Sequence, residues 1–119
     1  MSTLNQRDQE LNDMILQGQI LEAFEKFYAD DVVMEEDGEA QVGKETNRKH
    51  EEQFVDALEA FHSAEVGARV VDDEEGVTFS EWSMEMTLEG VGRIEQNQVA
   101  VRTWNEDGQI THEKFYKLG

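Results

Sequence analysis

The sequence contains no cysteine and no proline, and it has only 10 lysine and arginine residues against 28 aspartate and glutamate residues. The absence of cysteine excludes disulfide bonds and thiolate chemistry. The formal net charge of −18 argues against nucleic acid and anionic membranes as partners, because both bind clustered basic side chains. The chain also lacks a stretch of the roughly 20 apolar residues that cross a bilayer, and its N-terminus lacks the apolar core of a signal peptide. We therefore expect a cytoplasmic protein that binds neither nucleic acid nor membranes.

The chain does have a regular distribution of apolar residues. Leu, Ile, Val and Phe make up about 24% of the sequence, above the roughly 20% below which chains tend to be disordered. A length of 119 residues is close to the commonest size of one domain. We expect one folded domain over residues 1–119, with its excess of acidic side chains on the surface.

Helical spacing marks the first two segments. Ser2 or Thr3 caps a first helix, which carries its apolar residues on one face and ends at Gly18. The apolar residues of 21–28 recur every three or four positions and predict a second helix, which the pair Asp30-Asp31 ends.

A short strand and a third helix follow. The β-branched run at 32–34 predicts a strand that closes at Asp37-Gly38. After Gly43, a third helix is expected from about Lys44 to Phe61, with a polar first half and an apolar stripe in its second half.

The rest of the chain alternates between apolar and polar residues. This period of two predicts four strands, at about 66–71, 77–88, 93–104 and 109–118, joined by short turns. Helices followed by antiparallel strands predict an α+β fold, in which three N-terminal helices pack on a strongly curved, mainly antiparallel sheet. Long strands have to bend around the helices, so we expect a cone with a pocket inside.

Three segments carry a family resemblance. FEKFYADDVVMEEDG at 24–38, Gly43, and VAVRTWNEDGQITHEKFY at 99–116 resemble the nuclear transport factor two-like superfamily, in particular its SnoaL-like and ketosteroid isomerase-like group. The resemblance implies the cystatin-like cone. It implies the activity less well, because the superfamily includes isomerases, cyclases, dehydratases, hydrolases and proteins that only bind ligands.

The resemblance places the general base of the isomerases at Glu36. Their oxyanion-binding tyrosine falls near Leu11 and their protonated aspartate near Ala100, and neither side chain here donates a hydrogen bond. Losing one oxyanion donor costs on the order of 10²–10³ in rate, so steroid-type isomerisation is not expected. The tyrosine, aspartate, asparagine and arginine set of limonene epoxide hydrolases is not evident either, since Arg102 alone does not make that site.

Glu36 is the candidate catalytic residue. Strand alternation puts Glu35 and Glu36 on opposite faces, so one of them points inward, and burial there raises a carboxyl pKa toward neutral pH. The alternative is that Glu36 belongs to a solvated acidic run. Arg102 either binds a substrate carboxylate or pairs with Glu113 on the adjacent final strand.

The predicted binding pocket is mostly apolar and takes a small, partly apolar organic ligand. Its expected wall consists of Phe24, Met34, Phe54, Leu58, Trp82, Met84, Arg102, Trp104, Glu113 and Phe115. No cofactor is expected. No metal site is expected either, since paired ligands at helical spacing are missing, and His112 is expected on the surface or at an interface.

The sheet face away from the helices carries Val99, Val101 and Thr103 with nothing predicted to cover it. Such a face favours a homodimer, as does the resemblance. Two functions remain open: an enzyme that uses Glu36 as a base, or a module that binds its ligand without reaction. A purely structural dimer is less favoured, because polar residues are expected inside the cone.

Overall fold

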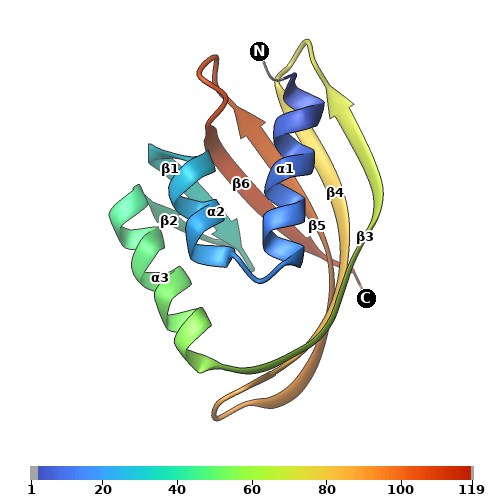
Figure 1. The fold of residues 1–119 in the computed structure, drawn as a ribbon. Helices are drawn as coiled ribbons and strands as arrows, with labels where there is room; N and C mark the ends of the chain where they lie inside the picture. Colours follow the sequence, from blue (N-terminus) through green and yellow to red (C-terminus); the bar gives the residue numbers. More distant parts are fainter. Residues whose placement is uncertain (1–2, 119) are drawn as a thin grey trace.

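Three helices lie across one face of a six-stranded sheet in the computed structural model, which describes residues 3–118 (Figure 1). The helices are α1 (Leu4–Leu16), α2 (Ile20–Phe27) and α3 (Lys44–Ala57). The strands are β1 (Tyr28–Glu36), β2 (Glu39–Val42), β3 (Leu58–Asp72), β4 (Val77–Leu88), β5 (Gly92–Trp104) and β6 (Ile110–Lys117). Their order in the sheet is β2-β1-β6-β5-β4-β3, and all neighbours are antiparallel except β1 and β6. The predicted α+β class is confirmed.

The first helix begins and ends where its sequence predicts. The backbone N–H of Gln6 donates to the Thr3 hydroxyl over 3.1 Å, and the Gln6 side-chain oxygen accepts from the Thr3 N–H over 2.8 Å. This reciprocal cap satisfies two backbone donors at the start of α1. Gly18 has a φ of +81°, the left-handed conformation that ends helices.

Two predicted helix ends are wrong. The second helix ends at Phe27 instead of Asp30-Asp31, because Tyr28 pairs with Ile110 and begins β1. The third helix ends at Ala57 instead of Phe61, because Leu58 pairs with Leu88 and begins β3. In both places, pairing in the sheet overrides a helical spacing of apolar residues.

The sequence analysis missed the short strand β2. Asp37 and Gly38 both have positive φ, of +54° and +81°, as a two-residue hairpin turn requires. β2 therefore returns against β1, with Glu39 opposite Glu36. The strand has four residues and no clear apolar alternation, so its pattern carried little signal.

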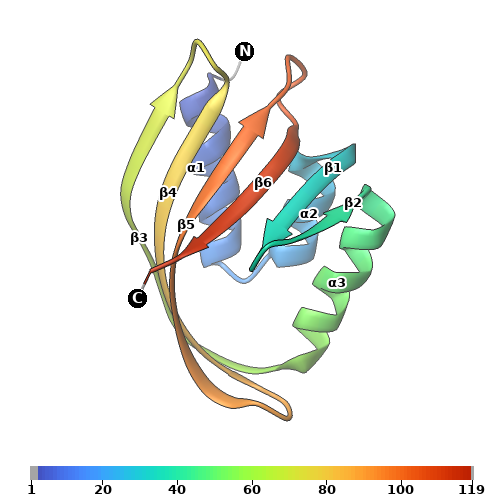
Figure 2. The same cartoon turned by 180° about the vertical axis from the view of Figure 1, so that it is seen from behind.

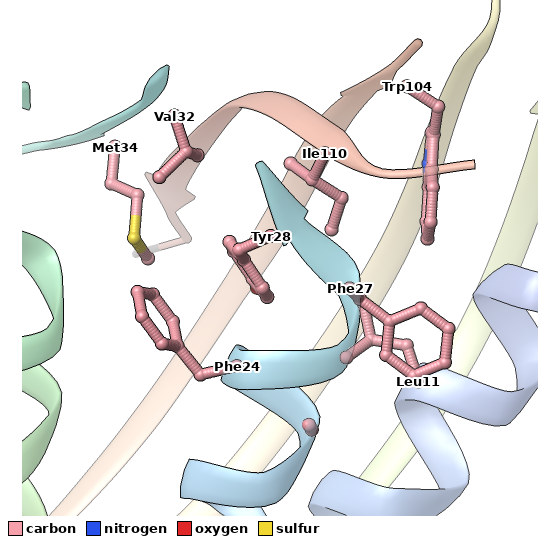
Figure 3. Packing of buried hydrophobic residues seen from close by; sticks show 9 residues of the cluster. Leu11, Phe24, Phe27, Tyr28, Val32, Met34, Trp104 and Ile110 are labelled. Atoms are coloured by element: carbon pink, nitrogen blue, oxygen red, sulfur yellow. The ribbon is translucent and has the colours of Figure 1, made fainter. Parts of the chain in front are cut away.

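The hydrophobic core lies between α1, α2 and strands β1, β5 and β6 (Figure 3). The rings of Phe24 and Tyr28 stack with centroids 4.9 Å apart, and Phe27 meets Trp104 edge to face at 6.2 Å. The core cluster consists of Leu11, Ala23, Phe24, Phe27, Tyr28, Val32, Met34, Trp104 and Ile110. These residues close one end of the space between helices and sheet.

The other end of that space is less tightly filled. Strands β3, β4 and β5 continue past α1 and curve toward the C-terminal end of α3 (Figures 1 and 2). The bend makes the sheet concave on the side that the helices cover, as expected for the predicted cone. Among residues 3–118, no helix combines the length and the apolar character that a membrane span requires.

Candidate functional site

A cavity of about 380 Å³ lies between the three helices and the concave side of the sheet. Its wall is largely apolar, with Phe24 from α2, Phe54 from α3, Trp82 and Met84 from β4, and Phe115 from β6. The polar residues that line it are Tyr28, Glu36, His50, Glu51, Gln96, Gln98, Arg102 and Glu113. A mainly apolar cavity with a few polar groups is typical of small-molecule sites.

Most of the residues that the sequence predicted for the pocket line this cavity. They are Phe24, Phe54, Trp82, Met84, Arg102, Glu113 and Phe115, and Glu36, the predicted catalytic residue, lines the cavity as well. Met34 and Trp104 lie in the hydrophobic core instead, where Trp104 packs against Phe27. Leu58 does not line the cavity, whereas Leu88, its partner on β4, does.

Arg102 and Glu113 form a buried ion pair at the core end of the cavity. They face each other on β5 and β6, and Arg102 Nε donates to Glu113 Oε2 over 2.7 Å. The Tyr28 hydroxyl donates to the same carboxylate, at 2.8 Å from each oxygen. Of the two roles that the sequence left open for Arg102, the structure shows the pairing with Glu113.

The ion pair extends into α1 through Asp8. Arg102 Nη1 donates to Asp8 Oδ1 over 2.9 Å and to Asn12 Oδ1 over 2.6 Å. Arg69 on β3 donates to Asp8 Oδ2 through Nη2 and Nε, and the Thr78 hydroxyl donates to Asp8 Oδ1. Two guanidinium groups are thus balanced by the carboxylates of Asp8 and Glu113.

Burial and neighbouring charge shift two pKa values in this network. Burial raises the pKa of Tyr28 well above its ordinary value, and the adjacent Glu113 carboxylate raises it further. Burial by itself lowers the pKa of Arg102, but Glu113, Tyr28 and Asp8 outweigh that effect and raise it above the ordinary arginine value. Tyr28 therefore stays neutral and Arg102 stays charged at neutral pH.

Glu51, in the middle of α3, presents a carboxyl group to the cavity. Burial raises its pKa to about 7, and the charges of Glu113 and Glu36 add to the effect. Within residues 3–118, neither a hydrogen bond nor a cation contributes to this shift. A carboxyl group that titrates near neutral pH is suited to accept and return a proton.

The predicted catalytic residue Glu36 lies at the mouth of the cavity. Its side chain is 49% exposed, with an oxygen 3.8 Å from Lys117 Nζ. Glu35, on the opposite face of β1, contacts His112 Nε2 through a carboxylate oxygen. His112 does not line the cavity, whereas His50 does.

The sequence analysis missed Asp8, Asn12 and Glu51. A signal for the first two existed: both lie within the apolar face that Leu4, Leu11 and Ile15 define, and a polar residue on such a face is buried. Glu51 precedes Phe54 by three positions, so it lies on the inward face of the helix. Its neighbours in the sequence are polar, so the sequence pattern did not indicate that Glu51 faces inward.

Two further polar atoms in the wall are buried without a hydrogen-bond partner within residues 3–118. They are Trp82 Nε1 and Gln98 Oε1, which belong to opposed residues of β4 and β5. Leu11 and Ala100, near which the resemblance places the oxyanion-binding groups of the isomerases, are fully buried and offer no side-chain donor. In the part of the chain that the structure describes, no group of three or more His, Cys, Asp or Glu is arranged to hold a metal ion.

Comparison with known proteins gives one family and a consistent fold. The model of the SnoaL-like domain matches residues 2–117. No curated protein matches the sequence significantly. Among solved structures, a SnoaL-like polyketide cyclase-type protein from Mesorhizobium loti superposes with a TM-score of 0.81 at 23% identity, covering 97% of this chain and 99% of the other.

Two further structures have the same fold. The epoxide hydrolase/cyclase-like enzyme SalBIII, which has a role in pyran ring formation in salinomycin, gives a TM-score of 0.77 at 18% identity, covering 97% and 90% of the two chains. A Mycobacterium tuberculosis protein in complex with estradiol-17beta-hemisuccinate gives 0.74 at 19% identity, covering 92% and 89%. At these identities the likeness establishes the fold.

Proposed function

This chain belongs to the SnoaL-like domain family, and we propose that it binds a small, partly apolar organic molecule in the cavity and performs cofactor-free acid–base chemistry on it. The observation that carries the proposal is the carboxyl group of Glu51 in the cavity wall, with a pKa of about 7. A general base works best when its pKa lies near the working pH.

The network around Arg102 gives the cavity a fixed polar end. Glu113 accepts hydrogen bonds from Arg102 and Tyr28, so its orientation is determined before a ligand arrives. A preorganised polar group of this kind orients a ligand at little cost in entropy. Glu51 lies on α3, apart from this network, and so has a carboxylate free for proton transfer.

Glu36 is the second candidate base in this proposal. It shares the cavity wall with Glu51, but it lies at the mouth, half exposed and near Lys117. The family resemblance favours Glu36, and the burial of the carboxyl group favours Glu51. Substituting Glu36 and Glu51 one at a time distinguishes the two assignments.

The second candidate function is ligand binding without reaction. It is favoured by Leu11 and Ala100, which leave the cavity without the donors that stabilise an oxyanion in ketosteroid isomerases. In this case the cavity holds its ligand and the carboxyl groups serve only recognition.

Proton abstraction can be tested without knowledge of the natural substrate. 2-Tetralone is a small apolar ketone whose α-hydrogen exchanges in D₂O, which proton NMR follows. We expect the protein to accelerate this exchange, and Glu51→Gln to abolish the acceleration. Glu52→Gln is the matched control, because this neighbour on the same helix is exposed and does not line the cavity.

Each other result has a defined meaning. Loss of exchange in Glu36→Gln but not in Glu51→Gln assigns the base to Glu36. Binding of 2-tetralone without acceleration supports the binding module. Absence of binding, by this ketone and by a wider set of small cyclic molecules, contradicts the proposal.

We also infer that two copies associate through the sheet face that no helix covers (Figure 2). Val70, Phe79 and Val101 occupy opposed positions on β3, β4 and β5, so they form one row on this face. Val70 is 59% exposed and Phe79 is 39% exposed. An exposed apolar row on an uncovered sheet supports a self-complementary contact.

A further inference from the structure

The charges that line the cavity do not cancel. Arg102 and Arg69 carry two positive charges, which the buried carboxylates of Asp8 and Glu113 balance through direct ion pairs. Glu36 at the mouth has Lys117 nearby, at 3.8 Å. Within residues 3–118, Glu51 forms no ion pair with a basic side chain, and the two charged groups that shift its pKa, Glu113 and Glu36, are both acidic.

The wall around this uncompensated carboxyl group is aromatic. Phe24, Tyr28, Phe54, Phe61, Trp82 and Phe115 all line the cavity. The faces of aromatic rings carry partial negative charge and attract cations. The same wall contains the buried Gln98 Oε1, an acceptor without a donor within residues 3–118. The carboxyl group, the rings and the amide oxygen therefore all favour the same sign of charge in a ligand.

We propose that the ligand of this cavity is a cation, an alkylammonium group on an apolar body, and that its positive charge lies against Glu51. The inference rests on the proposed function in so far as it assumes that the cavity binds a small molecule. It adds the charge of the ligand, which separates amines from the ketones, acids and neutral polyketides that a mainly apolar cavity would otherwise accept.

An anionic ligand is disfavoured for the same reason. The guanidinium of Arg102 is the obvious partner for a carboxylate, but its Nε and Nη1 already donate to Glu113, Asp8 and Asn12. A ligand carboxylate would have to use the remaining Nη2 or displace one of these groups, and it would lie among Glu36, Glu51 and Glu113. Repulsion between neighbouring like charges that are partly buried costs on the order of several kcal/mol.

A bound cation also affects the protonation of Glu51. The groups that face Glu51 are Glu36 and Tyr28 from β1, Glu113 from β6 and Arg102 from β5, with His50 next to it on α3. A positive charge among them opposes the repulsion from Glu36 and Glu113 and favours the ionised carboxylate. Cation binding is therefore expected to strengthen as the pH rises through about 7, where Glu51 loses its proton.

Two probes of the same shape test the proposal. Phenyltrimethylammonium and tert-butylbenzene differ in one atom, a charged nitrogen in place of a carbon. Binding to the full chain is followed by calorimetry and by tryptophan fluorescence, to which Trp82 in the cavity wall contributes. At about pH 8, where an ordinary histidine is neutral, we expect the cation to bind at least about tenfold more tightly than its isostere.

Substitutions show whether the preference arises at Glu51. Glu51→Gln is expected to reduce the preference for the cation to about threefold or less, while Glu52→Gln leaves it unchanged. Both variants remove one negative charge from the same helix, so the comparison cancels the general attraction of a chain of charge −18 for cations. An equal reduction in the two variants would overturn the proposal.

The remaining outcomes separate this inference from the proposed function. If tert-butylbenzene binds as tightly as the cation or more tightly, the cavity binds small molecules but the charge assignment is wrong. Tighter binding of benzoate than of phenyltrimethylammonium has the same meaning. If none of the three probes binds, the inference fails, and the exchange and binding of 2-tetralone decide separately whether the proposed function fails with it.

Discussion

Arg102 and Glu113 occupy opposed positions on neighbouring strands, and the guanidinium donates to the carboxylate over 2.7 Å with both side chains almost completely buried. A buried ion pair of this kind adds little net stability, because desolvation offsets the attraction. Removing one partner is costly, since the other charge stays buried. The pair is therefore a sensitive test of the polar end of the cavity.

Replacing Glu113 by Gln keeps the shape of the side chain but removes its charge. Arg102 and Arg69 then face only the carboxylate of Asp8, so we expect the free energy of unfolding to fall by about 3 kcal/mol. Urea denaturation measures the change. The exposed Glu95→Gln on β5 is the control, and a loss below about 1 kcal/mol in Glu113→Gln would show that the pair is not buried as described.

Glu51 is expected to make the protein less stable as the pH rises. Its pKa is about 7 in the folded chain against an ordinary value of 4.5, so the folded state binds the proton more tightly. The stabilisation from the protonated form is present below about pH 4.5 and is lost as the pH rises through 7. Glu51→Gln should thus exceed the parent in stability at about pH 8, by up to about 3 kcal/mol, and match it near pH 4.

The measurement for Glu51 is a pair of urea titrations at the two pH values. Glu52→Gln is the control. Every titrating group other than Glu51 and Glu52 is the same in both variants, so a difference between them arises at these two residues. If the stability difference between Glu51→Gln and the parent is independent of pH, the carboxyl group of Glu51 is solvated and the base assignment loses its support.

Tyr28 is expected to keep its proton far into the alkaline range. The chain has two tyrosines, so in Tyr116→Phe the ultraviolet absorbance of tyrosinate reports Tyr28 alone. Burial and Glu113 raise the pKa of Tyr28 well above 10.0, and ionisation should therefore coincide with unfolding. Ionisation near pH 10 in the folded protein would place the hydroxyl in contact with water and contradict its hydrogen bond to Glu113.

Association through the uncovered sheet face is tested by two matched substitutions. Val70 lies on that face, whereas Val91, which is 67% exposed, lies in the turn between β4 and β5. Sedimentation is expected to show a dimer at micromolar concentration and at least about a tenfold weaker association in Val70→Ser, with no change in Val91→Ser. A monomeric parent protein in moderate salt would remove the interface.

The strand pattern predicted most of the fold, because apolar and polar residues alternate clearly over long segments. Trp82 and Met84 alternate with polar residues, and the structure places both on the inner face of β4. The helix ends were less predictable. Leu58 fits a helical stripe as well as a strand, and only its pairing with Leu88, thirty positions later, decides between them.

The candidate site was predictable where a polar residue lies within an alternating strand. Arg102 and Glu113 follow from strand parity and the hairpin that joins β5 to β6. Glu51 and Asp8 depend on how helices are rotated against the sheet, which a single sequence does not reveal. Besides Asn12 on its own helix, Asp8 has partners on β3, β4 and β5, all more than 60 residues away.

These distant partners have a consequence for the order in which the chain folds. Asp8 and Arg102 are 94 positions apart, and β1 completes its ladder only with β6. During synthesis, Asp8 emerges with α1 long before Arg69, Thr78 and Arg102, the distant residues with which it pairs. Contacts of such long range slow folding, so a nascent chain stopped before Ile110 exposes the unpaired edge of β1 and leaves Arg102 without Glu113.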